Sequence, residues 1–442
     1  MTGMPSDRAS ETWPGRSWYE FSAPGVGALP RLTDHQRCRL AIIGGGLAGL
    51  SLALSLAERG VDGICLLEAA QPGHGASGRN GGFVFAGYSL GNEPLIAQVG
   101  VDRARLLHGW TRESVGLIRQ RVGSLKIDCQ LNPAGVLLAD WFDDAAGLLA
   151  QADRLRATLG FELDFIDQTR LDDYVRSARY SCGLLEPGSF HFHPLRYLQG
   201  LVTALAARGV QVFAESPVVE LTHPQASWLL QTPAGSMQAD QVVLATGGYD
   251  QQLYRPVQRA LQPVATYVAV TEPLGASLTA VLPSPVAVYD TRFAFDYYRP
   301  LPDQRLLWGG RISMAGRSPA AIRRLLKRDL ARVFPSLGEL DFAMAWGGWM
   351  SYATHQMPLL GRRADGLWYA LAFGGHGMAT TTLAGEVLAD AISGQDASRI
   401  KQFRRWPARW AGGALGRAGT QFVYWGLQAR DQLRSLRKRF RT

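Results

Sequence analysis

The hydrophobic pattern changes most sharply between residues 39 and 68. A short apolar run at 39–43 leads straight into a glycine-rich turn, and an apolar stretch of helical length, 47–59, follows and ends at Gly60. A second short apolar run occupies 64–67. Two short apolar runs on either side of an apolar segment of helical length predict a β-α-β unit with parallel strands.

A different pattern fills the second half of the chain. Residues 265–273, 286–301 and 304–313 are rich in aromatic and β-branched residues and are separated by proline and aspartate turns. That pattern predicts antiparallel strands. Between the two patterns, 193–213 predicts a helix that ends at Gly209 and then a strand. The chain is therefore expected to be α/β, or α+β overall, with a parallel and an antiparallel part.

The turn after the first strand has the spacing of a dinucleotide-binding loop. Gly44 permits the tight turn, Gly46 lets a pyrophosphate approach the backbone, and Gly49 lets helix and strand pack closely. Glu68 closes the second strand, where a carboxylate can accept hydrogen bonds from a ribose. This Rossmann-like pattern suits both NAD and FAD.

Three later segments distinguish these two cofactors: QPGHGASGRNGG at 71–82, ADQVVLATGGY at 239–249 and FGGHGMATTT at 373–382. Together with the first turn, they resemble the family of flavoproteins that contains D-amino-acid oxidase, glycine oxidase and sarcosine oxidase. The GASGRNGG form is similar to the branch of gamma-glutamylputrescine oxidoreductase. The segment from residue 373 and the basic tail resemble bacterial L-pipecolate oxidases.

The resemblance implies an FAD-binding domain in three pieces, 38–92, 188–262 and 343–400. An antiparallel substrate domain would comprise 93–187 and 263–342, with an N-terminal extension, 1–37, and a basic amphipathic tail, 401–442. The FGGHG segment would pass beside the flavin ring, and a helix from about Ala379 would direct its positive end at that ring. Besides Gly44, Gly46, Gly49 and Glu68, the residues expected to bind the cofactor are Ser77, Gly78, Arg79, Asn80, Gly81, Val218, Gly247, Gly375, His376, Gly377 and Met378.

Amine oxidation by a flavin needs few side chains, chiefly a carboxylate anchor and aromatic walls. Residues 297–299, Tyr-Tyr-Arg, supply both, so Arg299 and Tyr298 are the expected catalytic residues together with His376. Arg299 has the planar fork that suits a carboxylate. Arg292 and Arg311 are alternatives for the same role.

The cofactor is expected to be non-covalent FAD. Relatives of the sarcosine oxidase type attach flavin through a cysteine in the C-terminal third, and this chain has no cysteine after Cys182. His74 is one position out of register with the histidine that other relatives use. No histidine, cysteine or carboxylate grouping has the spacing of a metal site.

The charge is concentrated at the C-terminus. Residues 401–442 hold eleven Lys and Arg and one acidic residue, Asp431, whereas the first 400 residues have a net charge of −1. From Phe422 to Phe440, apolar residues recur at helical spacing. This pattern predicts a helix that lies on an anionic membrane surface, or a helix packed on its own domain with a solvated basic face.

These features lead to one preferred function, the FAD-dependent oxidation of a C–N bond to an imine. The preferred substrate is a secondary or cyclic amino acid such as L-pipecolate, and the acceptor is O2 or a quinone. A gamma-glutamylputrescine-type amine, a modified tRNA base and a non-enzymatic membrane-bound flavoprotein are the alternatives, and the near-neutral body argues against nucleic acid. The first 37 residues lack the pattern of a signal peptide, so a cytoplasmic protein is expected, with peripheral membrane contact through the tail.

Overall fold

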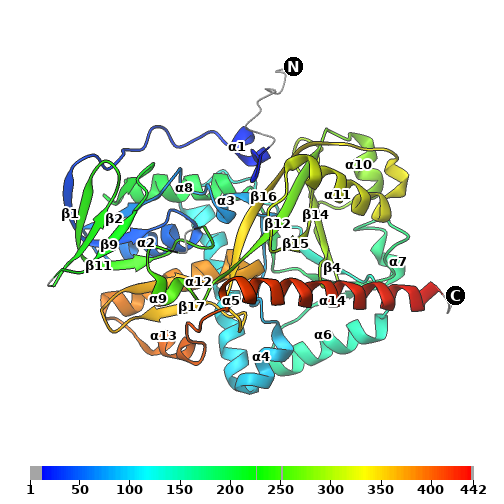
Figure 1. The fold of residues 1–442 in the computed structure, drawn as a ribbon. Coiled ribbons are helices and arrows are strands. Elements are labelled where there is room, and N and C mark those ends of the chain that lie inside the picture. The colour runs from blue at the N-terminus through cyan, green and yellow to red at the C-terminus, as the bar shows by residue number, and fades with distance from the viewer. Residues whose placement is uncertain (1–11, 225, 250–251, 440–442) are drawn as a thin grey trace.

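The computed structural model describes residues 12–224, 226–249 and 252–439, and it contains two eight-stranded sheets side by side. Figure 1 shows the first sheet with its helices on the left and the second sheet on the right. The α/β class with a Rossmann-like and an antiparallel part is confirmed.

The first sheet is built around the predicted β-α-β unit. Its main path runs β17 (Leu359–Arg362), β18 (Trp368–Leu371), β11 (Ser236–Leu244), β1 (His35–Ile43), β2 (Ile64–Leu67) and β8 (Gln211–Phe213). The strands from β18 to β8 are parallel. β17 is antiparallel to β18, and β10 (Trp228–Gln231) and β9 (Glu220–Thr222) add an antiparallel extension to β11.

Both faces of the middle of this sheet are buried, which explains why the paired segments 40–43, 64–67 and 242–244 are wholly apolar. Leu40 and Ile42 pack on one face with α2, whereas Ala41 and Ile43 face a second cluster that contains Trp228. The helices of the chain are α1 (Trp18–Ser22), α2 (Leu47–Glu58), α3 (Ala76–Arg79), α4 (Asn92–Val99), α5 (Val101–Ser124), α6 (Ala145–Leu159), α7 (Gln168–Leu171), α8 (Pro194–Ala206), α9 (Arg255–Gln258), α10 (Ala276–Val281), α11 (Pro319–Val333), α12 (Gly377–Ser393), α13 (Ser398–Gln402) and α14 (Gly413–Arg439). Short 3-10 turns lie at η2 (Pro335–Leu337), η3 (Gly374–His376) and η4 (Phe403–Arg405).

The second sheet is antiparallel except where β13 pairs with β4. Its order is β16 (Phe342–Tyr352), β12 (Gln262–Thr271), β15 (Leu306–Ser313), β14 (Asp296–Pro300), β13 (Ala287–Asp290), β4 (Val136–Ala139), β6 (Gly183–Glu186) and β5 (Asp164–Ile166). A separate small pair joins β3 (Phe83–Val84) to β7 (Phe190–His191). One face of the sheet packs on α11 through a core that includes Trp308, Ile322 and Leu326.

Two parts of the predicted domain division differ from the structure. β16 pairs with β12 along nearly its whole length, so residues 343–352 belong to the second sheet, although they were expected in the FAD-binding part. α5 was expected in the substrate domain, but Leu107 and Ile118 pack in the core of the first sheet. In both cases the apolar pattern shows that the segment is buried and does not show against which sheet.

Candidate active site

A single cavity of about 870 Å³ extends between the two glycine-rich segments that the sequence analysis singled out. Gly44, Gly46 and Glu68 line one part of it, and Gly375 and His376 line another. Segments more than three hundred residues apart in sequence therefore contribute to the same site.

The three glycines of the first turn differ in what surrounds them. Gly44 has a φ of +115°, in the region that favours glycine, and a Cβ at Gly49 would lie 2.0 Å from the Gly44 carbonyl oxygen. Gly49 therefore sets the close packing of α2 on β1 and does not line the cavity. Gly46 lines the cavity and precedes α2, whose N-terminus has no side-chain cap. The N–H groups at this helix end are thus suited to phosphate oxygens.

Glu68 and Ser77 hold the same end of the cavity in shape. The Gly45 N–H donates to Glu68 Oε2 at 2.7 Å, and the Leu47 N–H donates to Ser77 Oγ at 2.9 Å. Both side chains line the cavity, as do Val218 and Gly247, which has a φ of +63°. The carboxylate at the carboxyl end of β2 is where a dinucleotide ribose would lie.

The residues of the GASGRNGG segment have different positions. Ser77, Asn80 and Gly81 line the cavity, whereas Gly78 packs against Gly73, whose carbonyl oxygen a Cβ would meet at 2.2 Å. Arg79 also lines the cavity, but protein acceptors engage its guanidinium. It donates to the carbonyl oxygens of His74 and Gly15 and pairs with Glu20 at 2.9 Å, which fixes the N-terminal segment to this loop.

At the other end of the cavity, the FGGHG segment forms η3, and α12 follows. The helix begins at Gly377, two residues before the predicted start, and its N-terminus also has no side-chain cap. Gly375, Gly377 and Met378 line the cavity. Burial lowers the pKa of His376 to about 4, so its imidazole is neutral at pH 7. Its ring meets Phe85 edge-on at 5.0 Å.

These observations fit FAD. The cavity has at each end a helix N-terminus whose N-cap residue provides no side-chain cap, a glycine whose Cβ would enter it and a carboxylate at the ribose position. The end formed by α2 suits the pyrophosphate, and the end formed by α12 suits the negative charge that develops on a reduced flavin. The cysteines are all buried, and none of the four lines the cavity.

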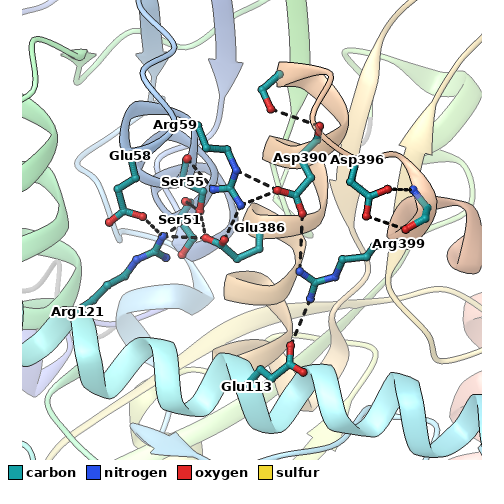
Figure 2. Close-up of polar contacts among 12 residues, drawn as sticks. Ser51, Ser55, Glu58, Arg59, Glu113, Arg121, Glu386, Asp390, Asp396 and Arg399 are labelled. Carbon is teal, nitrogen blue, oxygen red and sulfur yellow. Dashed lines mark hydrogen bonds and ion pairs between the residues drawn. The ribbon is translucent and has the colours of Figure 1, made fainter.

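An ion-pair network that the sequence analysis missed fixes α2 and α12 relative to each other (Figure 2). Arg121 of α5 donates to Glu58 and Glu386 at 2.6 and 2.9 Å, and Arg59, the residue that follows α2, pairs with Glu386 and Asp390 of α12 at 2.7 Å each. Although burial opposes the shift, hydrogen bonds from Ser55 and Arg59 and the charge of Arg121 hold the pKa of Glu386 below its usual value. The charged residues of this network come from segments far apart in sequence and form no motif, so the sequence gives no indication that they pair.

The part of the cavity under the second sheet is walled by aromatic rings that touch in series. Phe85 stacks on Tyr289 at 5.7 Å, Tyr289 meets Phe295 at 5.6 Å, and Phe295 meets Tyr297 at 6.3 Å. All four residues line the cavity. Because Phe85 also contacts His376, this aromatic wall adjoins the end of the cavity that suits the flavin. The wall provides an apolar compartment for a substrate.

Tyr298 is not part of this compartment, contrary to expectation. Side chains alternate along β14, so Tyr297 points into the cavity and Tyr298 points to the opposite core. There the Tyr298 ring stacks on Trp308 at 4.5 Å with an angle of 5° between the planes. Tyr297 is therefore the residue of the predicted cluster that can touch a ligand.

Arg299 also lies outside the described lining of the cavity. Its guanidinium is 2% exposed and donates to the carbonyl oxygens of Gly81 and Phe192 at 2.6 and 2.9 Å and to the Tyr19 hydroxyl at 3.1 Å. Arg292 is 10% exposed and pairs with Asp290 and Asp296. Neither Arg292 nor Arg299 is among the residues that line the cavity, so the structure does not support the role of carboxylate anchor expected for Arg299.

Arg311 lines the cavity at a β-bulge. The pairing of β12 with β15 passes from Thr266–Ile312 to Tyr267–Gly310, so Arg311 is the extra residue, and its φ is +60°. A bulge redirects a side chain out of the regular alternation, and a non-glycine residue with positive φ is uncommon. Asp329 of α11 holds the guanidinium through Nε and one Nη, which leaves the other Nη for a ligand, and the side chain is 21% exposed.

The comparisons with known proteins agree with this geometry. The model of the family described as FAD dependent oxidoreductase, DAO, matches residues 39–391. The chain is 32% identical to gamma-glutamylputrescine oxidoreductase from Escherichia coli over 88% of its length and 92% of that protein. A probable oxidoreductase OrdL from Haemophilus influenzae is also 32% identical, over 86% of this chain and 89% of that protein.

Among solved structures, glycine oxidase from Geobacillus kaustophilus superposes with a TM-score of 0.69 at 20% identity, over 85% of this chain and 99% of that chain. L-proline dehydrogenase from P. horikoshii superposes with a TM-score of 0.67 at 16% identity, over 86% and 100%. These two likenesses concern the fold. The match of the family model over most of the chain, on a cavity that fits FAD, shows that this protein belongs to the DAO family of FAD dependent oxidoreductases.

Proposed function

We propose that this protein oxidises the C–N bond of an amine that carries a carboxylate, and that its substrate is a secondary or cyclic amino acid such as L-pipecolate. The observation that carries the proposal is Arg311, which lies at a bulge in the lining of the aromatic cavity and has one Nη that Asp329 does not engage. A guanidinium binds a carboxylate through charge-assisted hydrogen bonds. The aromatic wall next to it suits the methylene groups of a small ring.

Different residues of the cavity would have different roles in such a reaction. Bound FAD supplies the two-electron acceptor for removal of a hydride from the carbon that carries the nitrogen. Arg311 holds the carboxylate, and the rings of Tyr289 and Tyr297 exclude water and orient the reacting carbon. His376 is neutral, so it adds no positive charge that would repel the amine, which loses its proton to solvent so that its nitrogen lone pair can assist removal of the hydride. Water then hydrolyses the imine product.

A gamma-glutamylputrescine-type substrate is the second candidate. It is favoured by the 32% identity to the Escherichia coli enzyme of that name over nearly its whole length. Such a substrate also carries a carboxylate, but that group is many bonds away from the oxidised carbon. A short amino acid places its carboxylate beside the reacting carbon, so Arg311 would have to lie close to the flavin for that substrate. For gamma-glutamylputrescine, a carboxylate anchor would have to lie farther away.

A substrate screen under anaerobic conditions separates these candidates. Pipecolate, proline, sarcosine, gamma-glutamylputrescine and carboxylate-free amines are mixed in turn with the protein, and flavin bleaching is followed by absorbance. We expect the fastest bleaching with a cyclic or N-substituted amino acid. Bleaching by gamma-glutamylputrescine alone would reject the preferred substrate, and bleaching by none of them would reject amine oxidation as the function.

The same screen identifies the electron acceptor. After reduction, the flavin is exposed either to O2 or to a quinone analogue, and the rate of reoxidation is compared. Fast reoxidation by O2 indicates an oxidase, whereas fast reoxidation by the quinone alone indicates a dehydrogenase.

The flavin should be held without a covalent bond. We expect the purified protein to be yellow and acid precipitation to release intact FAD into the supernatant, because no cysteine lines the cavity. His74 does line it and serves as the internal check. Yellow colour that stays in the pellet of wild type and disappears in His74→Ala would show a covalent bond to that histidine.

A further inference from the structure

The C-terminal helix α14 is attached to the protein by its polar side. Thr420 Oγ1 donates to Gln262 at 2.8 Å, the Met314 N–H donates to Gln421 at 3.0 Å, and the Phe293 N–H donates to Asp431 at 2.7 Å. Trp141 Nε1 donates to Ser435 at 3.2 Å, and Arg434 pairs with Asp144 at 2.8 Å. Figure 1 shows α14 lying across the molecule beside the second sheet.

The opposite side of α14 exposes apolar side chains. These are Leu415, Phe422, Val423, Trp425, Leu433 and Leu436, and they are between 48% and 84% exposed. A surface helix of a globular protein normally turns its apolar stripe to the core. Here the stripe predicted from the sequence exists, but the fold uses the other side of the helix. Phe440, which completed the predicted stripe, lies outside the described residues.

We propose that the outer face of α14 binds the surface of an anionic lipid bilayer. Single exposed apolar residues are ordinary, but six on one helix form a continuous face of the kind that binds a partner or a membrane. The charge around the face selects the occupant. Residues 401–442 have a net charge of +10, and Arg430 and Arg434 are 70% and 54% exposed.

A bilayer with acidic headgroups complements both properties of this face, because acyl chains accept Phe422 and Trp425 while headgroups attract the arginines. A second copy of the chain would bring two strongly positive helices together. Among the described residues, no helix is long and apolar enough to cross a membrane, so contact would be limited to the bilayer surface. Tyr424 on the inner side of α14 lines the cavity, so docking would hold the active site close to the membrane.

The test is flotation of the full-length flavoprotein with vesicles of phosphatidylcholine, with or without phosphatidylglycerol, at low and high salt. We expect flotation only with the acidic vesicles at low salt. The variant Phe422→Ser/Trp425→Ser/Leu433→Ser should lower the partition coefficient by at least about a hundredfold, because it removes three large apolar groups. Arg430→Glu should lower it by roughly tenfold.

Matched variants control for general surface effects. Leu106→Ser/Leu149→Ser/Val219→Ser removes apolar side chains that are 46% to 62% exposed elsewhere, and Arg324→Glu reverses a charge on α11. Both should float like wild type, and all variants should keep their flavin absorbance. Equal flotation of wild type and the α14 triple variant would overturn the proposal. A dimer of wild type that the triple variant converts to monomer, without vesicle binding by either, would instead make this face a self-interface.

Discussion

Gly46→Leu should yield a folded protein that retains no flavin. A Cβ at this position would meet only Ser77 Oγ, at 2.9 Å, and a serine hydroxyl can turn aside, so the fold should survive. The rest of the leucine would fill the place where the pyrophosphate approaches the N-terminus of α2. Overpacking of ~3 kcal/mol would weaken FAD binding about a hundredfold. Absorbance after gel filtration and the far-UV circular dichroism spectrum measure the two properties.

Two glycines provide controls for this result. Gly116→Leu lies at an exposed position of α5 where a Cβ meets nothing within 4 Å, so that variant should stay fully yellow. Gly49→Ala should unfold, because its Cβ would lie 2.0 Å from the Gly44 carbonyl oxygen. If Gly46→Leu kept a full complement of FAD, the pyrophosphate would not lie at this turn.

Replacement of Arg311 should lower activity on carboxylate-bearing substrates, whereas replacement of Arg299 should lower the stability of the fold. Arg311→Lys keeps a positive charge beside Asp329 but loses the planar fork, so we expect kcat/KM for a carboxylate-bearing substrate to fall roughly thirtyfold, about 2 kcal/mol. Oxidation of a carboxylate-free amine should change little. The ratio of the two activities is the measurement, because general damage to the site would lower both.

Arg299→Met should instead lower stability. Its loss leaves the buried carbonyl oxygens of Gly81 and Phe192 without their donors, at a cost of about 1–3 kcal/mol each. We expect a lower denaturant midpoint and, in the protein that remains folded, an unchanged KM. A variant that unfolds like wild type but binds carboxylate substrates poorly would return the anchor role to Arg299 and remove it from Arg311.

The extent to which the sequence predicted the active site depends on how local each feature is. The roles of Gly44 and Gly49 follow from spacing alone, because the turn and the close packing involve residues within a single β-α unit. The choice between Tyr297 and Tyr298 needed the register of β14, since a shift of one residue reverses the face of every side chain. An error of one position was enough to select the residue that points into the core.

The arginines show a second limit. Arg292, Arg299 and Arg311 were all candidates for the carboxylate anchor. The sequence shows that a cation is present at each position but does not show which acceptors surround it. The bulge at Arg311 arises from the pairing of β15 with β12, two strands about forty residues apart in sequence. The ion-pair network of Arg59, Arg121 and Glu386 could not be predicted from the sequence either, because its residues come from segments far apart in the chain.

The sequence by itself determined the elements of this protein and the chemistry of its cofactor turns. Apolar periodicity defines α2, β1 and β2. The need for glycine at positions 44 and 49 follows from steric contacts within a single β-α unit, which are local in sequence. Only the tertiary structure decided which side chains share the cavity, which arginine is available for a ligand and which face of α14 meets solvent. Those outcomes depend on contacts between segments far apart in the chain, and a pattern along the chain records that a residue is apolar or charged without recording its partner.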